Sequence, residues 1–363
     1  MGIESFVDFE RTADFRQKLL ENDIIIYDLM SNSFEEVDYV IKTLKTSDLQ
    51  EKKTLVLLSS VMTWVNTPPK LEEEKKEDDE EEGGAEEEAG ESTEEEPPSE
   101  EEGKEDDDRE EEEDPEVSEG GTPIEVKTPK YFKEEDHYLR VPHADFEHIK
   151  TLETTAMSSV NTQPNLRVHV LCAGIRYGNG ERTFYDHFQK AWIQDPKALP
   201  IIGEGNNLIP TIHVNDLANL VRRVVIENPK DHPYIFAIDK TRNPTQKRLV
   251  TWISKGLGTG EVASVPEETV SNNSGCRDKI QINLMMKASK AFKSIPLTPE
   301  ELELEEEEVE VIKKEKGFPW HCRFGMRSKI RMLETEFNTF RGLKPVKIFI
   351  TGPPASGKTF YAE

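Results

Sequence analysis

Continuous apolar runs alternate with segments of helical periodicity along most of the chain. The runs are short and rich in β-branched residues, which is typical of buried strands. Because runs that are apolar on both sides belong to parallel sheets covered on both faces, the pattern predicts a doubly wound, Rossmann-like α/β domain over about residues 1–300. The predicted strands are 23–28, 54–60, 166–171, 199–202, 209–212, 234–238 and, near the C-terminus, 346–351.

Between these runs, apolar residues recur at the spacing of helices that bury one face. For example, Val37, Val40, Ile41 and Leu44 share one side of a predicted helix. A charged stretch at 301–316 is interpreted as a solvated helix or a linker. The predicted helices are a segment through Val37–Leu44 and the segments 11–22, 143–160, 184–192, 216–226, 245–255 and 326–340.

A strongly acidic insert interrupts the α/β pattern at about 68–123. Its central part, 71–120, holds 30 Asp/Glu and 4 Lys/Arg, so nearly all of the chain's net charge of -27 lies there. Such a composition cannot bury enough apolar surface to offset its chain entropy, so we expect disorder. Its charge would also repel phosphates, which argues against nucleic-acid binding by this segment.

Other features exclude several classes of protein. The three cysteines, Cys172, Cys276 and Cys322, form neither a disulfide framework nor a metal-binding spacing. No apolar stretch reaches the length of a membrane span, and the N-terminus lacks the apolar region of a secretion signal. The sequence therefore predicts a cytoplasmic protein with no membrane and no nucleic acid among its partners.

Four segments resemble successive landmarks of one enzyme family. They are 23–28, 57–64, 170–178 and 200–216, and the last contains a Gly-x-Gly turn, a short strand and His-Val-x-Asp before a helix. This order resembles the extended short-chain dehydrogenases, in particular their sugar-epimerase branch. We expect Asp216, at the start of that helix, to cap free backbone amides.

The resemblance implies a chemistry that this sequence lacks in part. In the family, a Ser, a Tyr and a Lys four residues after the Tyr move protons while a nicotinamide takes the hydride. Ser60 falls at the Ser position, but the nearest match to the Tyr and Lys is Phe146 and Lys150, and Phe has no hydroxyl. The glycine-rich turn that would hold the cofactor pyrophosphate is also missing. We therefore expect vestigial positions, with neither NAD(P) binding nor dehydrogenase activity.

The C-terminal end contains a phosphate-binding loop. It matches G-x-x-x-x-G-K-S/T directly after a predicted buried strand, which is the context that the motif requires. The glycines turn backbone amides toward a phosphate, Lys358 reaches the outer phosphates, and the Thr359 hydroxyl takes a Mg²⁺ position in Mg-ATP. The predicted phosphate-binding residues are Gly352, Pro353, Pro354, Ala355, Ser356, Gly357, Lys358 and Thr359.

Gly-Pro-Pro-x-x-Gly-Lys resembles the loop of adenylate kinases, although Thr359 follows Lys358 directly where that family has Gly-Thr. A dehydrogenase-like domain before such a loop resembles the axoneme-associated adenylate kinases of motile cilia and flagella. The resemblance implies that the full-length protein converts ATP and AMP to two ADP and contacts axonemal proteins. Because the sequence ends four residues after Thr359, we expect a truncated kinase domain and no catalysis by this chain alone.

Two alternatives remain open from the sequence, namely a purely structural axonemal protein and an active NAD(P)-dependent epimerase or reductase.

The predicted organisation is the first part of the dehydrogenase-like domain at 1–67, the acidic insert at 68–123, the rest of that domain at 124–300, a charged linker and connector helix at 301–342, and the first strand and loop of the kinase domain at 343–363.

Overall fold

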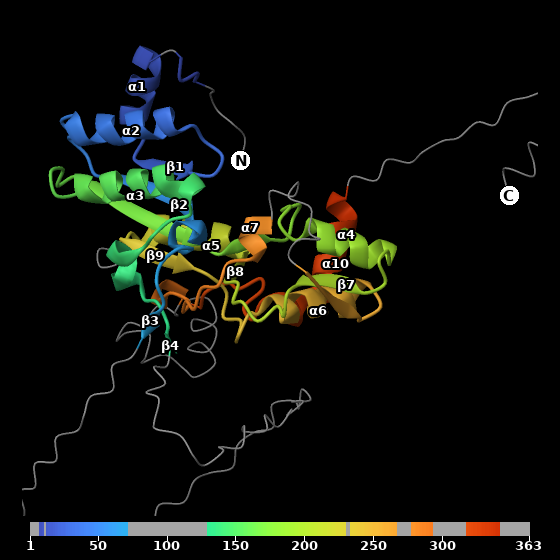
Figure 1. Ribbon diagram of the computed structural model, residues 1–363. Coiled ribbons are helices and arrows are strands. Elements are labelled where there is room, and N and C mark those ends of the chain that lie inside the picture. Colours follow the sequence, from blue (N-terminus) through green and yellow to red (C-terminus); the bar gives the residue numbers. More distant parts are fainter. Residues whose placement is uncertain are drawn as a thin grey trace, which may run out of the picture. The chain divides into compact units, whose positions relative to one another are not determined.

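The computed structural model describes residues 7–10, 12–71, 129–229, 233–266, 277–292 and 317–341 (Figure 1). The phosphate-binding loop at 352–359, the strand predicted before it, the charged stretch 301–316 and most of the acidic insert lie outside the described residues. The chain divides into two compact units, one of 1–69 with 131–363 and one of 70–130. In the second unit, the short strands β3 (Lys70–Leu71) and β4 (Pro129–Lys130) pair antiparallel.

The first unit is built on a parallel sheet with the strand order β1-β2-β5-β9. Ile24 of β1 pairs with Thr54 of β2, Lys53 of β2 pairs with Leu166 of β5, and Val170 of β5 pairs with Tyr234 of β9. The strands are β1 (Ile24–Asp28), β2 (Lys53–Ser60), β5 (Leu166–Ala173) and β9 (Tyr234–Ala237).

Helices cover both faces of this sheet, which explains why the strands β2, β5 and β9 are buried on both sides, whereas Ile24 and Ile26 of the edge strand β1 are exposed. In β5, Val170 and Cys172 face one hydrophobic cluster, whereas Leu171 and Ala173 face the other. The helices α2 (Phe34–Thr46) and α3 (Glu147–Ser159) pack side by side on the first face (Figure 1), and α5 (Val214–Glu227) packs on the second. The predicted parallel α/β sheet is confirmed.

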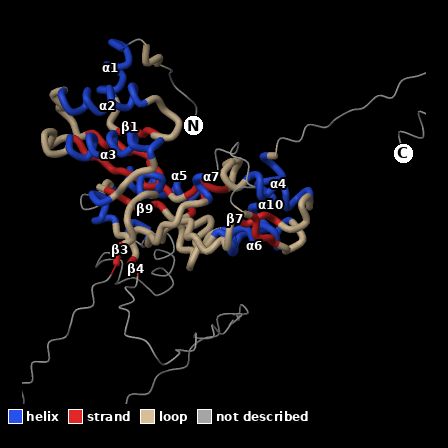
Figure 2. Tube along the Cα trace, in the orientation of Figure 1, coloured by secondary structure: helices blue, strands red, loops and turns tan. Residues whose placement is uncertain are grey.

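A second group of elements follows the sheet. Figure 2 shows the helices α4, α6 and α10 gathered around the strand β7, and α6 contacts α4, α10 and β7. The strand β10, which the sequence pattern did not predict, pairs parallel with β7, and β6 pairs parallel with β8. The elements are α4 (Tyr185–Ile193), α6 (Gln246–Leu257), α10 (Ile330–Phe340), β6 (Ile175–Tyr177), β7 (Leu199–Ile202), β8 (Thr211–His213) and β10 (Val262–Val265).

The remaining elements are short, and most connect the larger ones. They are α1 (Thr12–Glu21), α7 (Arg277–Ile280) and the 3₁₀ helices η1 (Val61–Trp64), η2 (Glu134–Leu139), η3 (Ala144–Phe146), η5 (Lys290–Phe292) and η6 (Met326–Lys329). Within the described ranges, no helix has both the length and the apolar character needed to cross a bilayer.

The segment 317–341 belongs to the hydrophobic core of the first unit. Cys322, Met326, Leu333 and Phe337 are all buried in the same cluster as the sheet residues on the α2–α3 side. Gly256 of α6 allows this packing, because a Cβ at that position would lie 2.1 Å from the Cγ1 atom of Ile330. The helix predicted at 326–340 is present as η6 followed by α10.

Candidate functional site

Ser60, the predicted vestigial serine, ends β2 and turns the chain into η1. Its hydroxyl oxygen accepts the backbone N–H of Met62 at 3.3 Å and so caps η1, while its carbonyl accepts the hydroxyl of Thr63 at 2.9 Å. Ser60 is buried. Its polar groups thus stabilise the turn at the carboxyl end of the strand.

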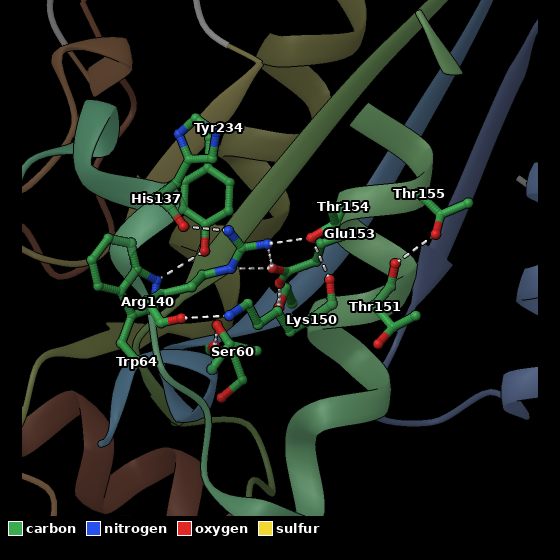
Figure 3. Close-up of polar contacts among 12 residues, drawn as sticks. Ser60, Trp64, His137, Arg140, Lys150, Thr151, Glu153, Thr154, Thr155 and Tyr234 are labelled. Atoms are coloured by element: carbon green, nitrogen blue, oxygen red, sulfur yellow. Dashed lines mark hydrogen bonds and ion pairs between the residues drawn. The ribbon is translucent and has the colours of Figure 1, made fainter. Parts of the chain in front are cut away.

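Phe146 and Lys150 lie at the start of α3, which packs against β2 and η1. Phe146 is the N-cap residue of α3, and its ring packs against the main hydrophobic cluster. The Nζ atom of Lys150 donates to the backbone carbonyl of Arg140 at 2.8 Å (Figure 3). The fold therefore brings the end of β2 and the first turn of α3 together, and the Lys150 amine ties α3 to the segment after η2.

A buried ion pair lies beside these residues. The Nε and Nη2 atoms of Arg140 both contact Oε2 of Glu153 at 2.9 Å (Figure 3). The Ser59 hydroxyl donates to the other carboxylate oxygen. Glu153 is 0% exposed and Arg140 3% exposed. Burial raises the pKa of Glu153, and the neighbouring Arg140 and the hydrogen bond from Ser59 offset that effect only in part. Sequence reasoning missed this pair, because a Glu in a helical pattern is normally assigned to the solvent side.

Aromatic side chains close the network from the side of β9. Trp64 Nε1 donates to the hydroxyl of Tyr234 at 2.9 Å, and the ring of His137 stacks on Tyr234 with a centroid distance of 5.3 Å. The Arg140 guanidinium lies over the same ring at 5.4 Å. Burial raises the pKa of Tyr234 well above its usual value. The phenol is therefore neutral and acts as the acceptor for Trp64.

The polar groups of this region are engaged with one another. The Lys150 amine, the Arg140 guanidinium and the Glu153 carboxylate each have a partner within the protein. Proton transfer to a substrate requires a group within hydrogen-bond reach of that substrate. The observed partners connect β2, η1, η2 and α3, which favours a structural role for the network.

A second polar cluster lies where α5 begins. His213 caps α5 through Nδ1, which accepts the Asn215 amide at 3.1 Å, and its Nε2 lies 3.0 Å from Oε2 of Glu336. The other carboxylate oxygen of Glu336 lies 3.1 Å from Nε2 of His321. Burial by itself would raise the pKa of Glu336, but the hydrogen bonds from the two histidines lower it below its usual value. Glu336 of α10 thus bridges two imidazoles.

Asp216 differs from the expectation that it would cap its own helix, because His213 is the N-cap residue of α5. The Asp216 carboxylate instead accepts the backbone amides of His321 at 2.5 Å and Cys322 at 2.8 Å. The reason is that the segment 317–325 approaches the first turn of α5 closely enough to present these two amides. No sequence signal connects Asp216 with residues more than a hundred positions away.

A pocket opens between β8 and the end of β9. Polar and apolar atoms line the pocket in about equal measure. Asp239 is its buried carboxyl group, which accepts the Thr211 hydroxyl at 2.8 Å and the Thr241 amide at 3.1 Å. Burial raises the pKa of Asp239 to about 6. The pocket residues are Tyr131, Leu208, Pro210, Thr211, Ile238, Asp239, Thr241, Asn243, Pro244, Leu284, Met285 and Met286.

Two curated proteins are similar to this chain in sequence, although no protein-family model matches it. Adenylate kinase 7 of Mus musculus is 27% identical over 353 residues, which cover 95% of this chain and 45% of that protein. Adenylate kinase 7 of Macaca fascicularis is 34% identical over 199 residues, or 54% of this chain and 33% of that protein. The chain therefore spans less than half the length of the curated relatives it matches.

Solved structures share the fold at low sequence identity. A dTDP-glucose 4,6-dehydratase from Bacillus anthracis in complex with NAD has a TM-score of 0.50 and 11% identity, covering 92% of this chain and 78% of that chain. UDP-N-acetylglucosamine 4-epimerase from Bacillus cereus has a TM-score of 0.50 and 10% identity, covering 94% and 85%. The chain thus has the parallel α/β fold of the extended short-chain dehydrogenase epimerases and dehydratases, and its sequence is similar to that of adenylate kinase 7.

Proposed function

We propose that this chain is the dehydrogenase-like portion of a ciliary adenylate kinase, and that this portion docks the enzyme on axonemal proteins without oxidoreductase chemistry of its own. The sequence similarity to adenylate kinase 7 over 95% of the chain carries the proposal. In the full-length protein, the activity would be the conversion of ATP and AMP to two ADP. The localisation that follows is the cytoplasm and the axoneme of cilia or flagella.

The proposed nucleotide site is the loop Gly352–Thr359, which begins the kinase part at 343–363. Its backbone amides would surround the ATP phosphates, Lys358 would neutralise developing charge, and the Thr359 hydroxyl would hold the Mg²⁺ of Mg-ATP. The residues that bind AMP would come from the part of the full-length protein beyond this chain.

The loss of dehydrogenase chemistry is supported by the contacts at the vestigial positions. Phe146 cannot exchange a proton, the Lys150 amine donates to the Arg140 carbonyl, and the Ser60 hydroxyl caps η1. In an active enzyme of this fold, the equivalent hydroxyl, phenol and amine would face the substrate and the nicotinamide. NAD(P) is therefore not part of the proposed function, and an NAD(P)-dependent reductase or epimerase is the less favoured candidate.

The docking proposal is tested by co-sedimentation of this chain with demembranated axonemes at physiological salt. The account predicts saturable binding, with the acidic insert deletion Δ71–120 as the control that separates docking by the folded portion from charge attraction. Binding that disappears in the deletion variant would assign docking to the insert instead. Absence of binding by both chains would overturn the proposed docking role.

The kinase proposal is tested on the full-length protein with ATP and AMP as substrates. We expect Lys358→Ala to lower kcat/KM by roughly 100-fold or more, because a cation at the transferring phosphate is lost, whereas Lys150→Ala should leave the kinase rate unchanged. If the unmodified full-length protein forms no ADP, the purely structural axonemal role becomes the better account.

A further inference from the structure

Three metal-ligating side chains converge at the start of α5, apart from the phosphate-binding loop. One ring nitrogen of His213, one of His321 and the Sγ atom of Cys322 all lie within 4.8 Å of one another. His213 and Cys322 are both 0% exposed, and the two imidazole centroids are 4.4 Å apart. Within the described residues, this is the one group of three or more His, Cys, Asp or Glu side chains with such a spacing.

We propose that His213, His321 and Cys322 bind a transition-metal ion of the zinc class, with Glu336 as the fourth ligand. Imidazole nitrogen and thiolate sulfur are the ligands that Zn²⁺ prefers in proteins, and a carboxylate oxygen commonly completes the tetrahedron. Glu336 lies beside these three side chains but outside their 4.8 Å spacing, and its two oxygens lie 3.0 and 3.1 Å from the Nε2 atoms of His213 and His321. Rotation of its carboxylate would bring one oxygen onto the metal. The site does not depend on the proposed function.

The distances require only a small contraction. Around Zn²⁺, bonds of about 2.0–2.1 Å to nitrogen and about 2.3 Å to sulfur bring the ligand atoms of a tetrahedron to roughly 3.3–3.7 Å from one another. From the observed limit of 4.8 Å, the ligand atoms of His213, His321 and Cys322 would approach by at most about 1.1–1.5 Å, which side-chain rotation supplies.

The surrounding contacts hold the ligands in position. Asp216 binds the backbone amides of both His321 and Cys322, and the Asn179 amide donates to Oε2 of Glu336 at 3.1 Å. Gly178 leaves the required room, because a Cβ there would lie 2.0 Å from Nε2 of His213. Partners of this kind orient the ligands in known metal sites.

The cluster also has a metal-free arrangement of hydrogen bonds, which competes with the metal-bound arrangement. Without metal, His213 accepts the Asn215 amide through Nδ1, so its proton is on Nε2 and is donated to Glu336. A metal on Nε2 moves that proton to Nδ1 and removes the cap of α5, and the Cys322 thiol proton is released to solvent. A single helix cap contributes much less than the binding free energy of a structural zinc site, so the metal-bound arrangement wins when zinc is available.

The experiment is a Co²⁺ titration followed by absorption spectroscopy, because a thiolate ligand adds a sulfur-to-cobalt charge-transfer band that oxygen ligands cannot give. This distinction matters here, since the acidic insert offers many carboxylates to any divalent cation. The chain used carries Cys172→Ser and Cys276→Ser, so that Cys322 is its one thiol among the three cysteines of the sequence. We expect one equivalent of tightly bound Co²⁺ with the charge-transfer band, and displacement of Co²⁺ by Zn²⁺.

The variants and controls decide the assignment. Adding Cys322→Ser should abolish the band. His321→Asn removes a direct ligand, so it should weaken Co²⁺ binding by more than the roughly 10- to 100-fold that loss of an outer-shell partner costs. Restoring Cys172, a buried thiol whose neighbours include Glu153 and Tyr234, should change nothing. Since Cys322 is buried and its replacement also perturbs the core, the thermal midpoint of the unmodified chain is measured with Zn²⁺ and with a chelator, and we expect Zn²⁺ to raise it. No charge-transfer band and an unchanged midpoint would overturn the site, as would a band that persists in Cys322→Ser.

Discussion

Replacing Arg140 by Met removes one partner of the ion pair inside the vestigial site. The substitution keeps the Arg140 backbone carbonyl, so the hydrogen bond from Lys150 remains. It leaves the Glu153 carboxylate, which is 0% exposed, with the hydrogen bond from the Ser59 hydroxyl and the more distant charge of Lys150. Breaking a buried pair from one side costs about 3–5 kcal/mol, and we expect a loss of that size in the free energy of unfolding at pH 8.

The double variant distinguishes loss of the pair from loss of packing. Arg140→Met with Glu153→Met removes both charges, so it should recover all but about 1–2 kcal/mol of the free energy of unfolding. The remaining loss comes from the unpaired Ser59 hydroxyl and from imperfect packing. The interaction energy of the cycle should then exceed about 2 kcal/mol. The matched control is Lys190→Met, which breaks the exposed pair with Asp186 on α4 and should cost less than about 0.5 kcal/mol.

The assay is urea unfolding at 25 °C followed by circular dichroism, at pH 8 and at pH 5. Burial already raises the pKa of Glu153, and removal of Arg140 raises it further. A group with a raised pKa binds its proton more readily in the folded state, so the penalty of Arg140→Met should shrink as the pH falls. A penalty below about 1 kcal/mol that is equal at both pH values would refute the reasoning.

Three further predictions concern other parts of the first unit. Burial lowers the pKa of His187 to about 4, so as the pH falls from 6.5 towards 4 the unfolded chain binds a proton before the folded chain does, and stability is lost. His187→Gln should remove up to about 3 kcal/mol of this pH dependence in urea titrations. Gly256→Ala stabilises an isolated helix, but here it should lower the thermal midpoint because its Cβ meets Ile330, and adding Ile330→Ala should recover part of the loss. Ser33→Ala removes the cap that accepts the Glu36 amide at 3.2 Å and should cost about 1 kcal/mol in urea unfolding, whereas Ser33→Asp should not.

The sequence pattern was sufficient for the central sheet because its strands β2, β5 and β9 are buried on both faces. Lys53–Ser60 contains the apolar run 55–58 and Leu166–Ala173 contains the apolar run 170–173, and such runs have few alternatives in a parallel α/β fold. The strand Val262–Val265 was missed because two of its four residues are exposed, so its sequence gives no apolar run. Exposed edge strands depend on pairing with a partner, and a single sequence does not record that pairing.

The candidate sites were predictable only in their local part. Ser60, Phe146 and Lys150 could be placed from motif spacing, and the structure positions them at the end of β2 and the start of α3. The contacts of Glu336 with His213 and His321 could not be predicted, since these residues come from separate elements brought together by the packing of 317–341. Tertiary clusters of this kind have no fixed spacing along the chain.

The similarity to adenylate kinase 7 and the fold of NAD-dependent epimerases imply different ligands, so cofactor binding is the sharpest test of the account. The measurement is an isothermal titration of this chain with NADH and NADPH at pH 7.5. We predict no saturable heat up to about 1 mM ligand, which corresponds to a binding free energy weaker than about 4 kcal/mol. One-to-one binding with a micromolar Kd would contradict the account and return the oxidoreductase function to first place.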